Sequence, residues 1–269
     1  MSEMLLYPFM QRALIGGLCV SLCAALLGVS LVLKRYSMIG DGLSHVGFGA
    51  LAVATALNAA PIAVSLPIVL LFAFLLLRLS ENSAIKGDAA IAVISAGSLA
   101  VGVIIVSLTK GMNTDLNNYL FGSILAMERS DVWLSVLLSA VVLVMYLLFY
   151  HRIFAVTFDE TFSRATGLNA NLYNGLIAAL TAVTVVLGMK MMGSLLISSL
   201  IIFPSLSAMR VCKTFRSVAC VSAVFSCVCF ISGLALSYAY NTPAGATVVA
   251  ANMVLFALCS LFGALLKRE

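Results

Sequence analysis

Residues 13–33 read ALIGGLCVSLCAALLGVSLVL, a run of 21 residues without a charged side chain. An α-helix rises 1.5 Å per residue, so a helix of this length spans about 31 Å, close to the ~30 Å hydrocarbon thickness of a bilayer. Similar runs recur along all 269 residues, of which 63% are hydrophobic and 9% charged, with a mean hydropathy of +1.16. A water-soluble domain carries roughly 25% charged residues. The sequence therefore predicts an all-α membrane protein, a polytopic helical bundle.

Nine stretches are long and apolar enough to be expected to cross a bilayer. They are residues 13–33, 43–58, 61–78, 89–109, 132–150, 173–189, 193–209, 217–239 and 245–266. The stretch 43–58 is short and rich in glycine and alanine, and only Lys190 to Met192 separate 173–189 from 193–209. Eight spans plus a re-entrant segment is therefore the alternative. Because no hydrophilic stretch is long enough for a second domain, residues 1–269 are predicted to form one transmembrane domain.

The distribution of lysine and arginine predicts the orientation. With the N-terminus outside, 11 of the 15 basic residues fall in the cytoplasm and 4 outside. The reverse orientation would invert this ratio, and cytoplasmic loops are the ones enriched in lysine and arginine, so we expect an N-out, C-in topology. The basic residues stand in ones and twos at the ends of apolar runs, so the net charge of +5 does not indicate binding to nucleic acid.

Two connections are predicted to contain short helices. In the outer segment 110–131, the apolar run from Tyr119 to Ala126 is too brief to span a bilayer and predicts a surface or re-entrant helix. In the inner segment 151–172, Phe158 and Phe162 stand at helical spacing and continue to Ala165. Asp159 and Glu160 suit a helix N-terminus and Gly167 suits a helix end, so we expect an amphipathic helix on the cytoplasmic face.

The polar residues that stand out are Asp41 and His45, at the cytoplasmic start of the second span. Their i, i+4 spacing puts both side chains on one helix face, and ionisable residues within a span usually line a pathway or polar cavity. Carboxylate and imidazole also bind zinc and manganese. Alternatively, Asp41 is a helix cap in a loop turned by Gly40 and Gly42, and His45 donates a hydrogen bond to a neighbouring helix. Two ligands make an incomplete zinc shell, which a two-fold dimer would complete.

Pro204 lies within the seventh predicted span, where it is a candidate gate or hinge; a static packing kink is the alternative. The chain has no G-x-x-x-x-G-K-[ST] loop, so ATP would have to be bound by a partner subunit. With His45 and His151 as its two histidines and no H-E-x-x-H motif, the chain is not expected to be an enzyme or to hold a bound cofactor.

Several segments, in order along nearly the whole chain, resemble the permease subunits of bacterial ABC importers for zinc and manganese, the ABC-3 group. They begin with Phe9-Met10-Gln11-Arg12-Ala13 and with Leu31 to His45, which contains the Asp41 and His45 pair. The middle segment is Asn118 to Leu125. The later ones are Met191 to Pro204 and Thr242-Pro243-Ala244-Gly245. Gly42 and Val46 depart from the family pattern, which has alanine or threonine, and alanine, at these positions in many members.

The resemblance implies a multi-pass permease of the bacterial cytoplasmic (inner) membrane, working as a homodimer or a pair of related permeases. Two cytoplasmic ABC ATPase subunits would supply the energy, and an extracytoplasmic metal-binding protein would deliver the ion. The transported ion would be Zn²⁺, with Mn²⁺ second, passing Asp41 and His45. The segment Thr157 to Asn171 would be the helix that couples to the ATPase, and its candidate coupling residues are Phe158, Asp159, Glu160, Phe162, Arg164 and Gly167. An ion-coupled secondary metal transporter and an ABC permease for a metal chelate are the alternative functions.

Overall fold

The computed structural model describes residues 7–82, 87–109, 122 and 129–266, and every regular element in these ranges is an α-helix. Eight of the helices are long and apolar enough to cross a membrane. The bounds of the elements are α1 Pro8–Leu33, α2 Ile39–Ala56, α3 Pro61–Asn82, α4 Gly87–Leu108, α6 Arg129–Leu148, α7 Tyr150–Phe158, α8 Glu160–Ala165, α9 Ala170–Met192, α10 Ser194–Val211, α11 Phe215–Tyr240 and α12 Ala244–Leu266. The predicted all-α membrane fold is confirmed.

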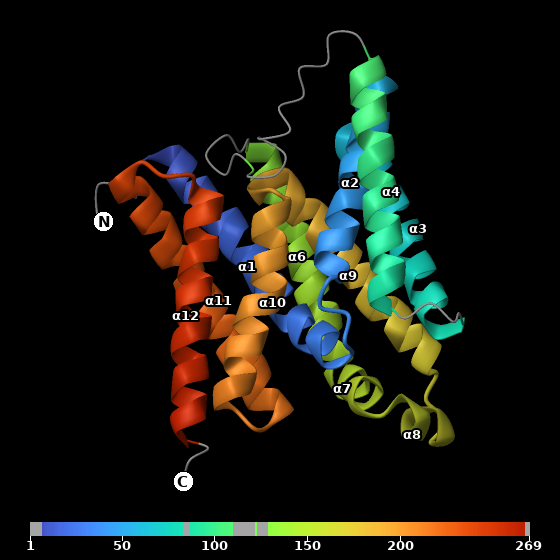
Figure 1. The fold of residues 1–269 in the computed structure, drawn as a ribbon, viewed down its shortest axis with the longest axis vertical. Helices are drawn as coiled ribbons and strands as arrows, with labels where there is room; N and C mark the ends of the chain where they lie inside the picture. The colour runs from blue at the N-terminus through green and yellow to red at the C-terminus, as the bar shows by residue number, and fades with distance from the viewer. Residues whose placement is uncertain (1–6, 83–86, 110–121, 123–128, 267–269) are drawn as a thin grey trace.

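Successive long helices run in alternate directions, and the chain begins at the upper end of the bundle and finishes at the lower end (Figure 1). The short helices α7 and α8 lie at the lower end, the end at which α1, α6 and α10 finish. Lys34 caps α1 and Arg210 lies in the last turn of α10. These basic residues gather at the end that the predicted topology places in the cytoplasm.

The helices form an inner and an outer group. Most residues of α1, α9 and α10 are buried, whereas α3, α4, α6 and α12 bury only about a fifth of theirs. The outer helices therefore present leucine, valine and phenylalanine side chains to the surroundings, as lipid-facing helices do. α2 is not among the eight apolar spans, yet two thirds of its residues are buried and it contacts α3, α4, α9 and α10. Neighbouring helices shield this polar, glycine-rich helix.

Of two sequence predictions about short connections, the structure resolves one. The stretches 173–189 and 193–209 belong to two helices, α9 and α10, which meet at Gly193. Gly193 has φ +85°, a left-handed conformation that glycine adopts at low cost and that lets the chain reverse within one residue. The predicted re-entrant helix over Tyr119 to Ala126 lies outside the described residues, except for Gly122.

The predicted short helix that starts at Asp159 and Glu160 and ends before Gly167 is confirmed as α8, whereas Phe158 belongs to the preceding helix α7. Asp159 has an extended backbone (φ −144°, ψ 96°), which ends α7 at Phe158 and starts α8 at Glu160. The physical reason is local, because the Asp159 side chain caps the new helix by accepting a hydrogen bond from the backbone N–H of Phe162 at 2.8 Å. The chain thus turns at Asp159 and continues as two short helices.

Pro204 lies inside a helix that continues across it from Ser194 to Val211. The next turn is tied to neighbouring helices: Ser205 Oγ and Ser222 Oγ lie 3.3 and 3.2 Å from the backbone oxygen of Ala25 in α1. A Cβ added to Gly28 of α1 would approach the carbonyl oxygen of Ile201 to 2.1 Å. The backbones of α1 and α10 are therefore in close contact beside Pro204, which favours a packed segment over a free hinge.

Candidate functional site

Asp41 and His45 lie one turn apart at the start of α2. Asp41 is in the first helical turn, and His45 Nε2 lies 3.6 Å from Asp41 Oδ2. The His45 side chain is 17% exposed and that of Asp41 is 41% exposed, so the carboxylate is the more accessible of the two groups. The predicted shared face of the two side chains is confirmed.

The two glycines beside Asp41 are part of the helix, so the alternative that they form a turn is wrong. A Cβ on Gly40 would come within 2.7 Å of Ile201 Cδ1 on α10, and a Cβ on Gly42 within 2.6 Å of Ile91 Cγ2 on α4. The glycines therefore let α2 fit closely between α4 and α10. Tight packing on these sides leaves Asp41 and His45 on the remaining face of the helix.

The hydrogen bonding of the pair also argues against a purely structural role. The residue that caps α2 is Met38, without a side-chain hydrogen bond, so Asp41 is not the cap. His45 Nδ1 is buried and has no hydrogen-bond partner among the described residues. Buried polar atoms are normally satisfied, so Nδ1 is an exception, and it is a different nitrogen from the Nε2 that faces Asp41.

The geometry of the pair fits shared coordination of a metal ion. Ligand atoms about 2.1 Å from a tetrahedral zinc lie about 3.4 Å from each other, and the observed separation is 3.6 Å. A small side-chain rotation would bring both atoms onto one ion. In the described parts of the chain, no group of three or more histidine, cysteine, aspartate or glutamate side chains could hold a metal. Among these residues, one chain therefore offers half of a four-ligand shell.

The α7–α8 segment separates its apolar and polar side chains. Phe158 and Phe162 are 62% and 65% exposed, which is unusual for phenylalanine in a segment outside the membrane-spanning helices. Gly167, two residues beyond α8, has φ +85°, and a Cβ added to it would meet no atom within 4 Å, in keeping with the predicted helix end. The two phenyl rings give this end of the bundle an exposed apolar surface.

Glu160 faces the bundle rather than the outside. Its Oε2 lies 3.3 Å from Lys34 Nζ of α1 and accepts a hydrogen bond from Asn174 Nδ2 of α9 at 3.0 Å. Its Oε1 accepts a hydrogen bond from Arg164 at 2.7 Å, and Arg164 also donates to Asn171 at 2.8 Å. Desolvation by itself raises the pKa of Glu160, but the hydrogen bonds from Asn174 and Arg164 and the charge of Lys34 outweigh it and lower the pKa below its usual value.

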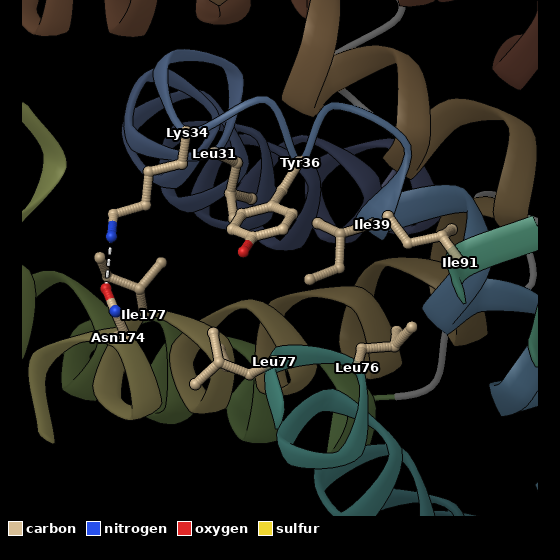
Figure 2. A pocket seen from close by; sticks show the side chains of 10 residues that line it. Leu31, Lys34, Tyr36, Ile39, Leu76, Leu77, Ile91, Asn174 and Ile177 are labelled. Atoms are coloured by element: carbon tan, nitrogen blue, oxygen red, sulfur yellow. Dashed lines mark hydrogen bonds between the residues drawn. The ribbon is translucent and has the colours of Figure 1, made fainter. Parts of the chain in front are cut away.

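Two members of this network were not identified from the sequence as functional residues. Lys34 is one of the 11 basic residues from which the sequence predicts the membrane topology. Asn174 lies inside the predicted apolar span 173–189. Figure 2 shows Lys34 reaching across to the Asn174 side chain at the edge of an apolar pocket. The signal that could have revealed Asn174 is its amide group within a hydrophobic stretch, because Asn174 is 3% exposed and a buried amide requires partners.

Known proteins resemble the chain over nearly its full length. Residues 6–263 match the model of the ABC 3 transport family. The chain is 32% identical to the high-affinity zinc uptake system membrane protein ZnuB of Haemophilus influenzae, covering 98% of this chain and 99% of that protein. It is 29% identical to the manganese import system permease protein ScaB of Streptococcus gordonii, covering 95% and 91%.

A solved structure described as PsaBC from Streptococcus pneumoniae in complex with Fab has a chain that superposes with a TM-score of 0.84 at 29% identity, over 94% of this chain and 91% of that chain. The family match spans nearly all of the polytopic helical bundle, including the Asp41 and His45 pair. This chain belongs to the ABC 3 transport family.

Proposed function

We propose that the chain is the membrane-spanning permease subunit of an ATP-driven importer of divalent metal ions, with zinc ahead of manganese. Relatives named for zinc uptake and for manganese import support the substrate class. The relative at 32% identity with 99% coverage is a zinc uptake protein, whereas the manganese proteins among those compared are 26–29% identical. In this proposal the chain is a multi-pass subunit of a transport system in the bacterial cytoplasmic membrane, which its membership of the ABC 3 transport family supports.

The observation that carries this proposal is the Asp41 and His45 pair on the shielded helix α2. Carboxylate and imidazole together suit both zinc and manganese. A single pair with a 3.6 Å separation would hold an ion weakly, since two ligands cannot fill a zinc shell. Weak, reversible binding is what a transport pathway requires, because the ion must leave again.

A second copy of the chain would complete the site. Two copies related by a two-fold axis would supply two carboxylates and two imidazoles, the four ligands of a tetrahedral zinc site. Movement of the copies relative to each other would then separate the pairs and release the ion. In this proposal Asp41 and His45 bind and orient the ion, and neither forms a covalent intermediate.

The lower end of the bundle would dock a cytoplasmic ATPase. Phe158 and Phe162 offer an exposed apolar surface there, and the neighbouring basic residues agree with a cytoplasmic location. A metal-delivering protein would bind at the opposite end of the bundle. ATP binding and hydrolysis in the partner would switch the permeases between outward- and inward-facing states.

Reconstitution tests the proposal. Proteoliposomes containing the chain and its ATPase should take up radiolabelled zinc only with ATP and Mg²⁺, and excess unlabelled zinc should compete better than manganese. Proteoliposomes containing the chain alone are the control for the secondary-transporter alternative. Zinc uptake by the chain alone, driven by an ion gradient, would refute the ATP-driven function.

A further inference from the structure

We infer that Lys34, Glu160 and Asn174 form a link that carries movement of α8 to the metal-binding start of α2. This inference rests on the proposed function and goes further by assigning a positioning role to residues that touch neither the ion nor the ATPase. The three side chains come from three elements, α1, α8 and α9, and bond to one another. We therefore name them the triad.

The triad is well satisfied and largely enclosed. The Lys34 side chain is 10% exposed, and its ammonium group contacts both Glu160 Oε2, at 3.3 Å, and Asn174 Oδ1. The Asn174 amide donates to the same glutamate oxygen at 3.0 Å, so each pair within the triad is in contact. An enclosed and fully bonded network holds its members in one geometry far better than an exposed ion pair does. Displacement of α8 would therefore displace Lys34.

The connection from Lys34 to α2 is short and internally bonded. The N–H of Arg35 donates to Val32 O at 3.1 Å and that of Tyr36 to Leu31 O at 2.8 Å, the two bonds of a Schellman motif. The N–H of Ile39 then bonds Tyr36 O at 3.0 Å, and α2 begins at that residue. These hydrogen bonds hold the connector in one conformation. A displacement of Lys34 is therefore passed on to Asp41 rather than absorbed within the connector.

A small apolar pocket lies beside the connector. Leu31, Tyr36 and Ile39 line one side of the pocket, and side chains of α3, α4 and α9 line the other (Figure 2). Lys34 and Asn174 lie at its edge. The connector is thus in contact with α3, α4 and α9 on this side, and close-packed contacts of this kind transmit a shift rather than absorb it. The triad and these contacts together connect the docking end of the chain to the metal ligands.

The network also explains why Glu160 need not touch the ATPase. Both of its carboxylate oxygens are occupied within the chain, by Lys34 and Asn174 on one side and by Arg164 on the other. The exposed phenyl rings of Phe158 and Phe162 are free to make the external contact. In this short segment, Phe158 and Phe162 would thus contact the ATPase, and Glu160 would pass the movement of α8 to Lys34.

The experiment measures zinc uptake and ATP hydrolysis in the same proteoliposomes, with the chain and its ATPase reconstituted together. K34M and E160Q should retain ATPase co-purification and hydrolyse ATP within about two-fold of the wild type. Zinc moved per ATP should fall at least 10-fold, because ATPase movement no longer reaches α2. The double variant K34E/E160K should recover several-fold over either single charge reversal, since the Asn174 amide can both donate and accept.

The matched control is the Lys190–Asp131 pair, which joins α9 to α6 at the other end of the bundle with a 2.5 Å contact. K190M removes a similar lysine–carboxylate contact far from α8 and should leave zinc moved per ATP unchanged. If K34M does not give folded protein, N174L removes the bridging amide, keeps both charges, and carries the same expectation as K34M.

Three results would overturn the inference. One is a finding that folded K34M, E160Q and N174L all move as much zinc per ATP hydrolysed as the wild type. Another is loss of ATPase co-purification in these variants, which would make the triad part of the docking surface. The third is a charge-swapped double variant no better than the single reversals. Absence of ATP-driven uptake by the wild-type protein would instead refute the proposed function, so the two failures are distinguishable.

Discussion

Two polar regions lie at the lower end of the bundle and differ in how their hydrogen bonds are satisfied. In the triad, Lys34, Glu160 and Asn174 all bond to each other. In the proposed metal-binding pair, His45 Nδ1 is buried without a partner among the described residues, and His45 Nε2 is 3.6 Å from Asp41. The first region is complete within one chain, and the second is not.

This difference separates structural from binding roles. A satisfied network stabilises the arrangement that it joins, so its loss should be felt in stability and in coupling. The Asp41 carboxylate and His45 Nε2 lie 3.6 Å apart without a hydrogen-bonded network around them in the described part of the chain, and an ion bound between these two atoms would supply the interaction that the chain itself does not. Four predictions test this contrast, ordered from the largest expected effect to the smallest.

The largest effect should come from the metal-binding pair. Asp41→Asn and His45→Phe each remove one of the two ligands that the chain offers. Loss of a group that merely orients a metal ligand typically costs 10- to 100-fold, so loss of a ligand should reduce zinc uptake by at least about 100-fold. Radiolabelled zinc uptake in proteoliposomes measures the effect, with ATPase co-purification as the check on assembly. Uptake within two-fold of the wild type in both variants would remove the ligand assignment.

The exposed phenyl rings should show the next largest effect. Phe162→Ala removes an apolar side chain that would be buried on docking, worth about 1.5–3 kcal/mol, or roughly a 10- to 100-fold loss of ATPase affinity. Binding of the ATPase to the detergent-solubilised chain measures it. Tyr240→Ala is the control, since Tyr240 is 73% exposed at the other end of the bundle, at the close of α11. Equal losses in both variants would contradict docking at α8.

The free energy of unfolding should respond differently to a substitution in each of the two polar regions. Asn174→Leu leaves Lys34 and Glu160 without the amide that bonds both, so the free energy of unfolding should fall by about 1–3 kcal/mol. His45→Phe removes Nδ1, which has no partner among the described residues, together with the long Nε2–Asp41 contact of 3.6 Å, so stability should change by less than about 1 kcal/mol. Thermal unfolding in detergent at fixed pH compares them. The contrast fails if His45→Phe destabilises the chain as much as Asn174→Leu.

The smallest effect concerns pH. Because the folded pKa of Glu160 is lowered from its usual 4.5, its ionised form stabilises the fold above that value, and this contribution is lost as pH falls through the folded pKa. The stability difference between wild type and Glu160→Gln should therefore be constant from about pH 6 to 8 and shrink below about pH 4.5. Unfolding measured across this range tests it, and a difference that grows on acidification would contradict the network.

The sequence predicted most of the fold because the hydropathy of each stretch follows directly from the residues in it. All nine predicted spans correspond to helices, with ends that shift by a few residues. The start of α2 is the informative exception, since the predicted span began at residue 43 and the helix begins at Ile39. A hydropathy pattern excludes Gly40, Asp41 and Gly42 from an apolar run, whereas in the structure they form the first turn of α2, with the two glycines packed against α10 and α4.

The candidate site was predicted in part. The i, i+4 spacing of Asp41 and His45 gave their shared face, because helical periodicity alone determines it. The role of Glu160 was expected at the ATPase surface, whereas its carboxylate points to Lys34 and Asn174. Those partners are 126 and 14 residues away along the chain, so no local pattern could have brought the three together.

Sequence by itself determined that this chain crosses a bilayer, which stretches form helices and that the carboxylate and imidazole share a helix face. These properties depend on the solvent preference of each side chain and on the helical period. Tertiary structure alone decided that polar α2 is shielded, that Glu160 faces inward and that His45 Nδ1 lacks a partner in the part of the chain that the structure describes. The physical reason is that burial and hydrogen-bond satisfaction are set by side chains distant in sequence, which meet only when the helices pack.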